Sequence, residues 1–168
     1  METLQCIQTR RSVRQYTGKI ISATDLKIIL TAAMYAPSAM NKRPWEFIIV
    51  QDKQLLEKIT QIHPYANFVK EAGTAVLICE NKNETYNEYG PVDISLAAQN
   101  LMLAAHDSGY GTCFCGVWPE QERLNDFSKL FKLPKHIQVI GLIAIGVPQK
   151  QPSQPERFEP IKIHFDQW

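Results

Sequence analysis

The chain has 168 residues, 45% of them hydrophobic and 21% charged, with a formal net charge of +1. This length and composition predict one globular domain, residues 1–168, with room for a substantial core. The near-neutral charge argues against general nucleic-acid binding, because no face can be strongly basic without an acidic face elsewhere. No signal peptide is visible, and the longest apolar-rich stretch would span only ~18 Å as a helix, against a bilayer core of ~30 Å. We therefore expect a soluble, cytoplasmic protein that binds neither nucleic acid nor membrane.

The first half of the chain alternates helical and strand patterns. Residues 22–36 open with Ser22 and Asp25 in capping-box spacing and continue with an apolar stripe, which predicts a helix. A buried strand is expected at 45–51 and a second helix at 53–62.

The middle of the chain contains the longest predicted helix, at 92–108. Before it we expect a short helical segment within 65–72, a strand at 74–80 and a polar surface loop at 81–90. Apolar residues surround the whole circumference of the 92–108 helix, so we expect burial on most sides, with a second subunit as one source of cover.

The last third of the chain predicts a strand at 110–118, an amphipathic helix at 120–131 and a nearly continuous apolar strand at 137–148. The tail, 149–168, is rich in proline and then alternates apolar and polar residues. It predicts an extended arm that ends in an edge strand.

Familiar catalytic motifs are missing from the sequence. Its glycines do not fit the dinucleotide-binding fingerprint, its four histidines lack metal-ligand spacing, and it has no serine nucleophile motif. Cys113 and Cys115, two apart on an expected strand, should face one side and pack as small hydrophobic groups in a reduced protein. We predict no metal site and no catalytic side chain, so any enzyme activity would take its chemistry from a cofactor.

An arginine cluster is the strongest positive signal. Arg10, Arg11 and Arg14 surround Ser12 near the start of the chain. Arginine forks bind two oxygens of an anion together, and a hydroxyl adds a further donor. From residue types alone, the anion could be a phosphate or a carboxylate, or the cluster could be a solvated basic turn.

A second polar stretch, APSAMNKRPWEF at 36–47, connects a predicted helix to a predicted strand. Ser38 and Asn41 offer a hydroxyl and an amide of the kind that bind a heterocycle edge or a ribityl chain. The alternative is a simple connection between the two elements.

Together, RRSVRQYT at 10–17 and APSAMNKRPWEFIIV at 36–50 resemble the flavin-binding signature of the nitroreductase family, which comprises FMN-dependent NAD(P)H oxidoreductases. NFVKEAGTAVLI, LAAQNLMLAAHDSGYGTCFCG and LIAIGVPQK agree with that family in the same order, so the resemblance covers nearly the whole chain. It implies an α+β nitroreductase-like fold, with a central mixed β-sheet surrounded by helices. It also implies an intertwined homodimer that exchanges C-terminal arms, residues 158–168, and has two FMN sites at its interface.

The resemblance further implies which residues bind FMN. In the N-terminal segment, Arg10 would hold the phosphate with Arg11 beside it. Ser12 would support the phosphate or the ribityl end, and Arg14 would lie toward the ribityl chain or the pyrimidine edge. Arg157, from the tail, would return to the phosphate.

Other positions match family segments around the flavin ring. Asn67 and Lys70 would lie near the pyrimidine edge, and Cys115 and Gly116 near N5. The segment that would reach the flavin of the partner subunit contributes Pro37, Ser38, Ala39 and Asn41. Arg43 departs from the family, which commonly has glutamine there.

The implied reaction is ping-pong hydride transfer from NADH or NADPH, through flavin N5, to a nitroaromatic, a quinone or a similar small-molecule acceptor. Two alternatives stay open. The chain could bind or sequester flavin without useful turnover, or it could be a flavin enzyme of the same fold that dehalogenates or fragments its substrate.

Overall fold

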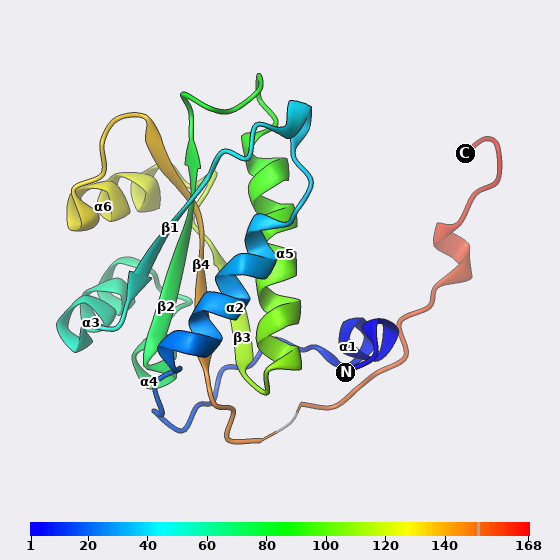
Figure 1. The fold of residues 1–168 in the computed structure, drawn as a ribbon, viewed down its shortest axis with the longest axis horizontal. Coiled ribbons are helices and arrows are strands. Elements are labelled where there is room, and N and C mark those ends of the chain that lie inside the picture. The colour runs from blue at the N-terminus through cyan, green and yellow to red at the C-terminus, as the bar shows by residue number, and fades with distance from the viewer. Residues whose placement is uncertain (151) are drawn as a thin grey trace.

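The computed structural model describes residues 1–150 and 152–168 (Figure 1). Its centre is a four-stranded sheet in the order β1-β2-β4-β3, and the strands are β1 (Trp45–Val50), β2 (Thr74–Asn81), β3 (Gly111–Gly116) and β4 (Ile137–Gly146). All three ladders are antiparallel. The expectation of a mixed sheet is therefore wrong for these strands. Among the described residues, parallel pairing is confined to an isolated bridge between Ser12 and Thr112. A mixed sheet would therefore need a further, parallel strand at one of its edges.

Helices cover both faces of the sheet, which confirms the α+β class. One face carries two neighbouring helices, α2 (Ala23–Met34) and α5 (Gly90–Asp107) (Figure 1). The other face carries α3 (Lys53–Ile62), the short α4 (Val69–Ala72) and α6 (Gln121–Phe131). Within residues 1–150 and 152–168, none of the helices has the length and apolar character needed to cross a membrane.

The predicted helix starts agree with the structure. The side chains of Ser22 and Asp52 cap α2 and α3, accepting hydrogen bonds from the backbone N–H groups of Asp25 at 3.1 Å and Leu55 at 2.9 Å. One helix, α1 (Thr3–Thr9), is absent from the sequence prediction. Its residues are largely polar, and the residue that it buries, Cys6, contacts α5. A helix with so small an apolar face leaves little periodic signal.

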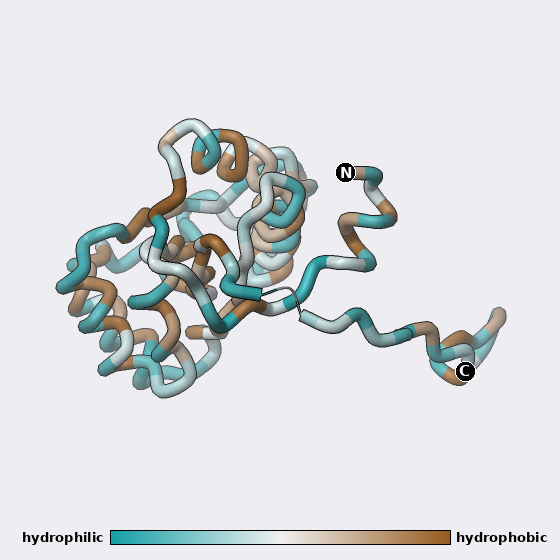
Figure 2. Tube along the Cα trace, turned by 90° about the horizontal axis from the view of Figure 1, so that it is seen from below, coloured by the Kyte–Doolittle hydropathy of each residue, from teal (hydrophilic) through white to brown (hydrophobic). Residues whose placement is uncertain are grey.

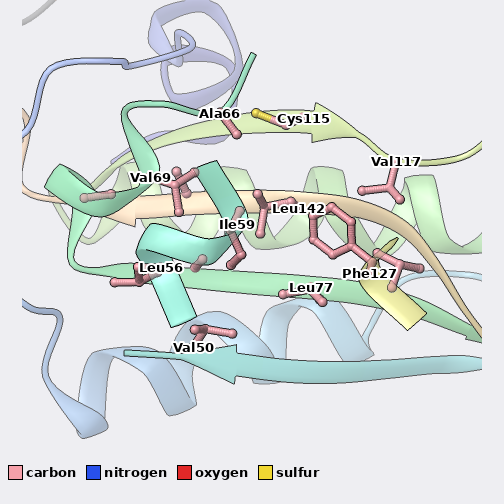
Figure 3. Packing of buried hydrophobic residues seen from close by; sticks show 14 of the residues in the cluster. Val50, Leu56, Ile59, Ala66, Val69, Leu77, Cys115, Val117, Phe127 and Leu142 are labelled. Carbon is pink, nitrogen blue, oxygen red and sulfur yellow. The ribbon is translucent and has the colours of Figure 1, made fainter. Parts of the chain in front are cut away.

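The sheet separates two hydrophobic clusters, because successive strand residues point to opposite faces. Leu77 of β2 belongs to the cluster with α3, α4 and α6, whereas its neighbour Ile78 belongs to the cluster with α2 and α5. Figure 3 shows the first cluster, in which Ile59 of α3 and Phe127 of α6 pack over the strands. Both helix residues are fully buried.

A bulge in β4 helps to position the chain beyond β3. Ile78 lies opposite Gly141 and Cys79 lies opposite Val139, which leaves Ile140 as the extra residue. The Ile140 carbonyl accepts hydrogen bonds from the backbone N–H groups of Val117 and Trp118, both at 3.1 Å. These bonds hold the chain that leads from β3 into α6.

Helix α5 packs on one side. Ile94 and Leu101 are fully buried, whereas Val92 and Leu96 are 55% and 41% exposed. The expected burial on most sides is therefore not reached within one chain, because no element among residues 1–150 and 152–168 covers this face of α5.

The C-terminal tail leaves the body beside α1 and runs outward (Figures 1 and 2). Instead of the expected edge strand, it contains a single 3₁₀ turn, η2 (Pro160–Lys162). A strand needs a neighbour for its backbone hydrogen bonds, and the described part of this chain places none beside the tail. Phe158, Ile161 and Phe165 are consequently exposed.

Candidate functional site

The arginine segment runs along the outer edge of β3. The Val13 N–H donates to the Thr112 carbonyl at 2.8 Å, and the Val13 side chain is buried beside Gly111. A Cβ on Gly111 would lie 2.8 Å from that side chain, so a glycine permits the close approach. Because an extended chain alternates its side chains, Ser12 and Arg14 stay exposed on either side of the buried Val13.

Three arginines gather where this segment meets the tail. Arg10, Arg11 and Arg157 line a cavity of 410 Å³. Burial lowers the pKa of Arg10, and the charges of Arg11 and Arg157 lower it further. Among residues 1–150 and 152–168, no ion pair involves any of these arginines. The cluster therefore concentrates positive charge that a bound anion would neutralise.

Arg11 is held by backbone carbonyls. Its Nη1 donates to the carbonyls of Gln8 at 2.6 Å and Arg10 at 2.7 Å, and its Nε donates to Ser153 at 3.1 Å. Arg11 thereby ties the end of α1 to the tail. This contact places Arg157, four residues beyond Ser153, near Arg10.

A larger cavity, of 640 Å³, lies beside β3, between the α3–α4 connection and the start of α6. Its volume is within the range of roughly 300–1,000 Å³ typical of small-molecule sites. The cavity brings together four of the residues expected to bind the flavin, namely Arg14, Asn67, Cys115 and Gly116.

Cys113 and Cys115 are both buried free thiols. Both line the same cavity, as expected for alternate residues on one face of a strand. The adjacent Cys115 thiol lowers the pKa of Cys113, burial opposes that effect, and the charge of Arg14 adds to the lowering. The adjacent Cys113 thiol, together with burial, raises the pKa of Cys115. Arg14 is thus close enough to act electrostatically on the floor of the cavity.

Sequence reasoning missed two residues that hold the Gly116 carbonyl. His63 Nε2 donates to this oxygen at 3.0 Å, and Arg123 Nη1 donates to it at 3.1 Å. Because a carbonyl can only accept, the His63 proton is on Nε2, and Nδ1 is a buried acceptor without a partner in the described chain. Positions 63, 116 and 123 follow no local spacing, so only the fold reveals that they meet.

The structure does not bring every expected residue to this cavity. Lys70 points elsewhere and pairs with Glu57 at 3.7 Å, where both side chains are about half exposed. The expected residues of the partner-reaching segment lie around η1 (Ala39–Asn41), at the opposite end of α2 from the arginine segment (Figure 1). They are Pro37, Ser38, Ala39 and Asn41.

The loop around η1 has a fixed conformation. Buried Asp93 of α5 accepts a hydrogen bond from the Ala39 N–H at 3.0 Å. The Ser38 hydroxyl accepts one from the Arg43 N–H at 2.9 Å. Met40, Asn41 and Arg43 all adopt left-handed backbone angles, with φ of 51°, 53° and 51°. Sequence reasoning did not find Asp93, whose anchoring role depends on the packing of α5 against α2.

Comparison with known proteins identifies the family. The Nitroreductase family model matches residues 7–63 and 61–147. The chain belongs to the nitroreductase family. It is 38% identical, over its whole length and 88% of its relative, to a Methanothermobacter thermautotrophicus protein named "Putative NADH dehydrogenase/NAD(P)H nitroreductase".

Solved structures agree with the family and the fold. An FMN-dependent nitroreductase from Clostridium difficile R20291 matches with a TM-score of 0.92 at 28% identity, covering 99% of this chain and 100% of that one. A Desulfovibrio desulfuricans protein solved in complex with FMN matches with a TM-score of 0.85 at 27% identity, covering 100% and 99%. The nitroreductase-like fold expected from the sequence is confirmed.

The protonation of His63 predicts a pH effect on stability. Burial lowers its pKa below the ordinary value of 6.5, and the charge of Arg123 adds to this, while the hydrogen bond to Gly116 opposes it. The unfolded chain therefore binds more protons than the folded chain as the pH falls below about 6.5, and the free energy of unfolding should decrease there. One such group contributes a slope of at most about 1.4 kcal/mol per pH unit.

Urea unfolding between pH 5 and 8 measures this slope. His63→Gln should flatten it below about pH 6.5, whereas the exposed control His164→Gln should leave it as in the wild type. Equal slopes for the wild type and His63→Gln would contradict the assignment of a buried neutral imidazole.

Proposed function

We propose that this chain is an FMN-dependent oxidoreductase that transfers hydride from NADH or NADPH to a small organic acceptor. The observation that carries this proposal is the alignment of two features along one edge strand. The arginine cluster of Arg10, Arg11 and Arg157 lies at one end of the segment beside β3, and the 640 Å³ cavity lies at the other. An extended molecule with a phosphate at one end and an aromatic ring at the other suits this arrangement.

The residues present fit FMN. Arg10 to Arg14 spans four residues, or roughly 13 Å of extended chain, which is on the scale of a ribityl chain with its phosphate. Arg10 would bind the phosphate, Ser12 lies along the connecting path, and Arg14 borders the ring cavity. These donors can be satisfied together by a single phosphorylated flavin.

When bound, FMN accepts two electrons and a proton from the nicotinamide and passes them to the acceptor. The chain's own residues would bind the cofactor and orient it and the substrates. Arg14 offers positive charge and Asn67 an amide at the cavity wall. A Cβ on Gly116 would meet only the Trp118 carbonyl, at 3.7 Å, so the space above this backbone is open to a ring. His63 and Arg123 fix the Gly116 carbonyl that borders it.

The proposed kinetic scheme is ping-pong, because one cavity would receive the nicotinamide and the acceptor in turn. A nitroaromatic or a quinone fits the aromatic wall that Tyr65 and Trp118 provide, since both are substantially exposed. This reaction does not require a side chain of the cavity to form a covalent bond with the substrate. The names of the relatives given above, which specify FMN and NAD(P)H, support the same class of activity.

Anaerobic absorbance spectroscopy tests this function directly. The purified protein, supplied with FMN, should lose its oxidised-flavin absorbance on addition of NADH or NADPH and regain it on addition of a nitroaromatic or a quinone. Persistent absorbance with both nucleotides would indicate a protein that binds flavin without reducing it. Release of halide or of flavin fragments, without net acceptor reduction, would favour the other flavin chemistries of this fold.

Arg10→Ala should weaken FMN binding much more than it affects folding. Loss of a charge-assisted phosphate contact costs on the order of 1.5–3 kcal/mol, or about ten- to a hundredfold in affinity. Fluorescence titration of FMN measures the change, with the exposed Lys53→Ala of α3 as the matched control for loss of one positive charge. An unchanged dissociation constant for Arg10→Ala would refute the phosphate assignment.

We also propose a homodimer that exchanges its C-terminal arms. The exposed apolar residues of the tail and of the outer face of α5, including Phe158, Phe165 and Leu96, support it, because a partner chain would cover them. The loop around Pro37, Ser38, Ala39 and Asn41 would then serve the flavin of the partner subunit. Each site would depend on both chains.

Removing residues 158–168 should convert the dimer to a monomer, because the apolar groups that would contact the partner chain are lost. FMN binding should weaken as well, even though Arg157 is retained, because each site would depend on both chains. Light scattering coupled to size exclusion measures the mass of both chains at one concentration. A monomeric full-length chain, or a truncated chain that remains dimeric, would contradict the arm exchange.

A further inference from the structure

The 640 Å³ cavity contains a second arginine, Arg123, which holds the Gly116 carbonyl but is assigned no direct contact with FMN in the proposed arrangement. Arg123 lies in the first turns of α6, is half-buried and lines the cavity beyond Gly116. Arg14 borders the same cavity near Cys113, at the other end of the buried thiol pair. The two arginines are therefore separated along β3, and Arg123 is on the side where α6 begins.

The charge of Arg123 is not balanced by a carboxylate. No ion pair formed by the described residues includes it. The carboxylate that lines the cavity, Glu120, is exposed and is not within ion-pair distance of Arg123. His63, which contacts the same Gly116 carbonyl, has a pKa lowered by burial and by Arg123 itself, so it adds no positive charge near neutral pH.

Arg123 also has hydrogen-bonding capacity to spare. One of its N–H groups donates to the Gly116 carbonyl, which His63 already engages. A guanidinium has five N–H donors in a planar fork that suits a carboxylate or a phosphate. Holding one carbonyl oxygen therefore does not account for an arginine in this position.

One aromatic side chain lies against the cation, and a second lines the same cavity. The Arg123 guanidinium carbon lies 5.7 Å from the centre of the Tyr65 ring, in a cation–π arrangement that orients the fork. Tyr65 is 73% exposed and Trp118 is 44% exposed, and both line the cavity. A flat ring would find stacking surfaces next to a positively charged fork.

We propose that Arg123 is a specificity-determining residue that binds the anionic substituent of an aromatic acceptor, with Tyr65 and Trp118 against its ring. This inference rests on the proposed oxidoreductase function and adds a substrate class to it, namely aromatic acceptors that bear a carboxylate or a similar anion. The phosphates of the nicotinamide dinucleotide have the same chemistry, so the experiment must distinguish the two sources.

The test compares 4-nitrobenzoate with its neutral counterpart 4-nitrobenzamide as acceptors for the FMN-loaded protein. The wild type should show the higher kcat/KM for the anion, mainly through a lower KM. Arg123→Gln should reduce the ratio of the two kcat/KM values by about ten- to a hundredfold. Arg123→Lys should restore part of the ratio, and Lys129→Gln, an exposed charge on the same helix, should leave it unchanged.

A binding measurement without turnover accompanies the kinetics. Calorimetric titration of 4-nitrobenzoate into the oxidised protein, with no nicotinamide present, should show a loss of affinity of the same size in Arg123→Gln. An unchanged kinetic ratio together with unchanged binding would overturn the proposal. A tenfold fall in the preference for NADPH over NADH, with the acceptor ratio intact, would assign the anion to the dinucleotide and overturn the acceptor assignment.

These outcomes separate the inference from the function on which it rests. Turnover of 4-nitrobenzamide by the wild type would support the oxidoreductase function whatever Arg123 does. If neither acceptor is reduced but 4-nitrobenzoate binds through Arg123, the proposed function fails while the anion site stands.

Discussion

The contact between Val13 and Gly111 is the constraint on which the candidate site depends. It brings the segment that carries the arginines against the edge strand β3, where the Val13 N–H bonds to the Thr112 carbonyl at 2.8 Å. A side chain at position 111 would separate the two, and the arginines would no longer follow the strand toward the cavity. The charge at the arginine cluster and the hollow beside Gly116 are thus parts of one linear arrangement. Its spacing is set by backbone pairing rather than by long side chains.

The sequence predicts the regular elements well, and for clear physical reasons. Helix α3 has a capping aspartate and a strong apolar stripe, and strand β4 is a nearly continuous apolar run, so local pattern and burial agree. Helix α1 and the tail are harder, because they bury few of their own residues and depend on what lies beside them. The bulge at Ile140 cannot be read from the sequence either, since it reflects the pairing of two distant strands.

The residues of the candidate site also differ in how far the sequence alone predicts them. Arg10, Ser12 and Arg14 are visible in the sequence because they are neighbours, and Asn67, Cys115 and Gly116 could be added through the family resemblance. His63 and Arg123 meet at the Gly116 carbonyl only because α6 and the α3–α4 connection approach the same strand end. Lys70 fits the family pattern in sequence, yet in the structure it lies beside Glu57. A matching motif locates a segment, but the direction of each side chain depends on the packing around it.

The position of Arg157 on the outgoing tail carries a thermodynamic consequence. An anion that neutralises Arg10 and Arg157 together also restricts the segment on which Arg157 is carried. Part of the interaction energy is then spent on lost chain entropy, so the affinity for that anion is lower than the contacts alone would give. Linkage makes this reciprocal: whatever immobilises the tail, including a second copy of the chain, would tighten anion binding by the same factor. Assembly and ligand retention would then be a single coupled equilibrium.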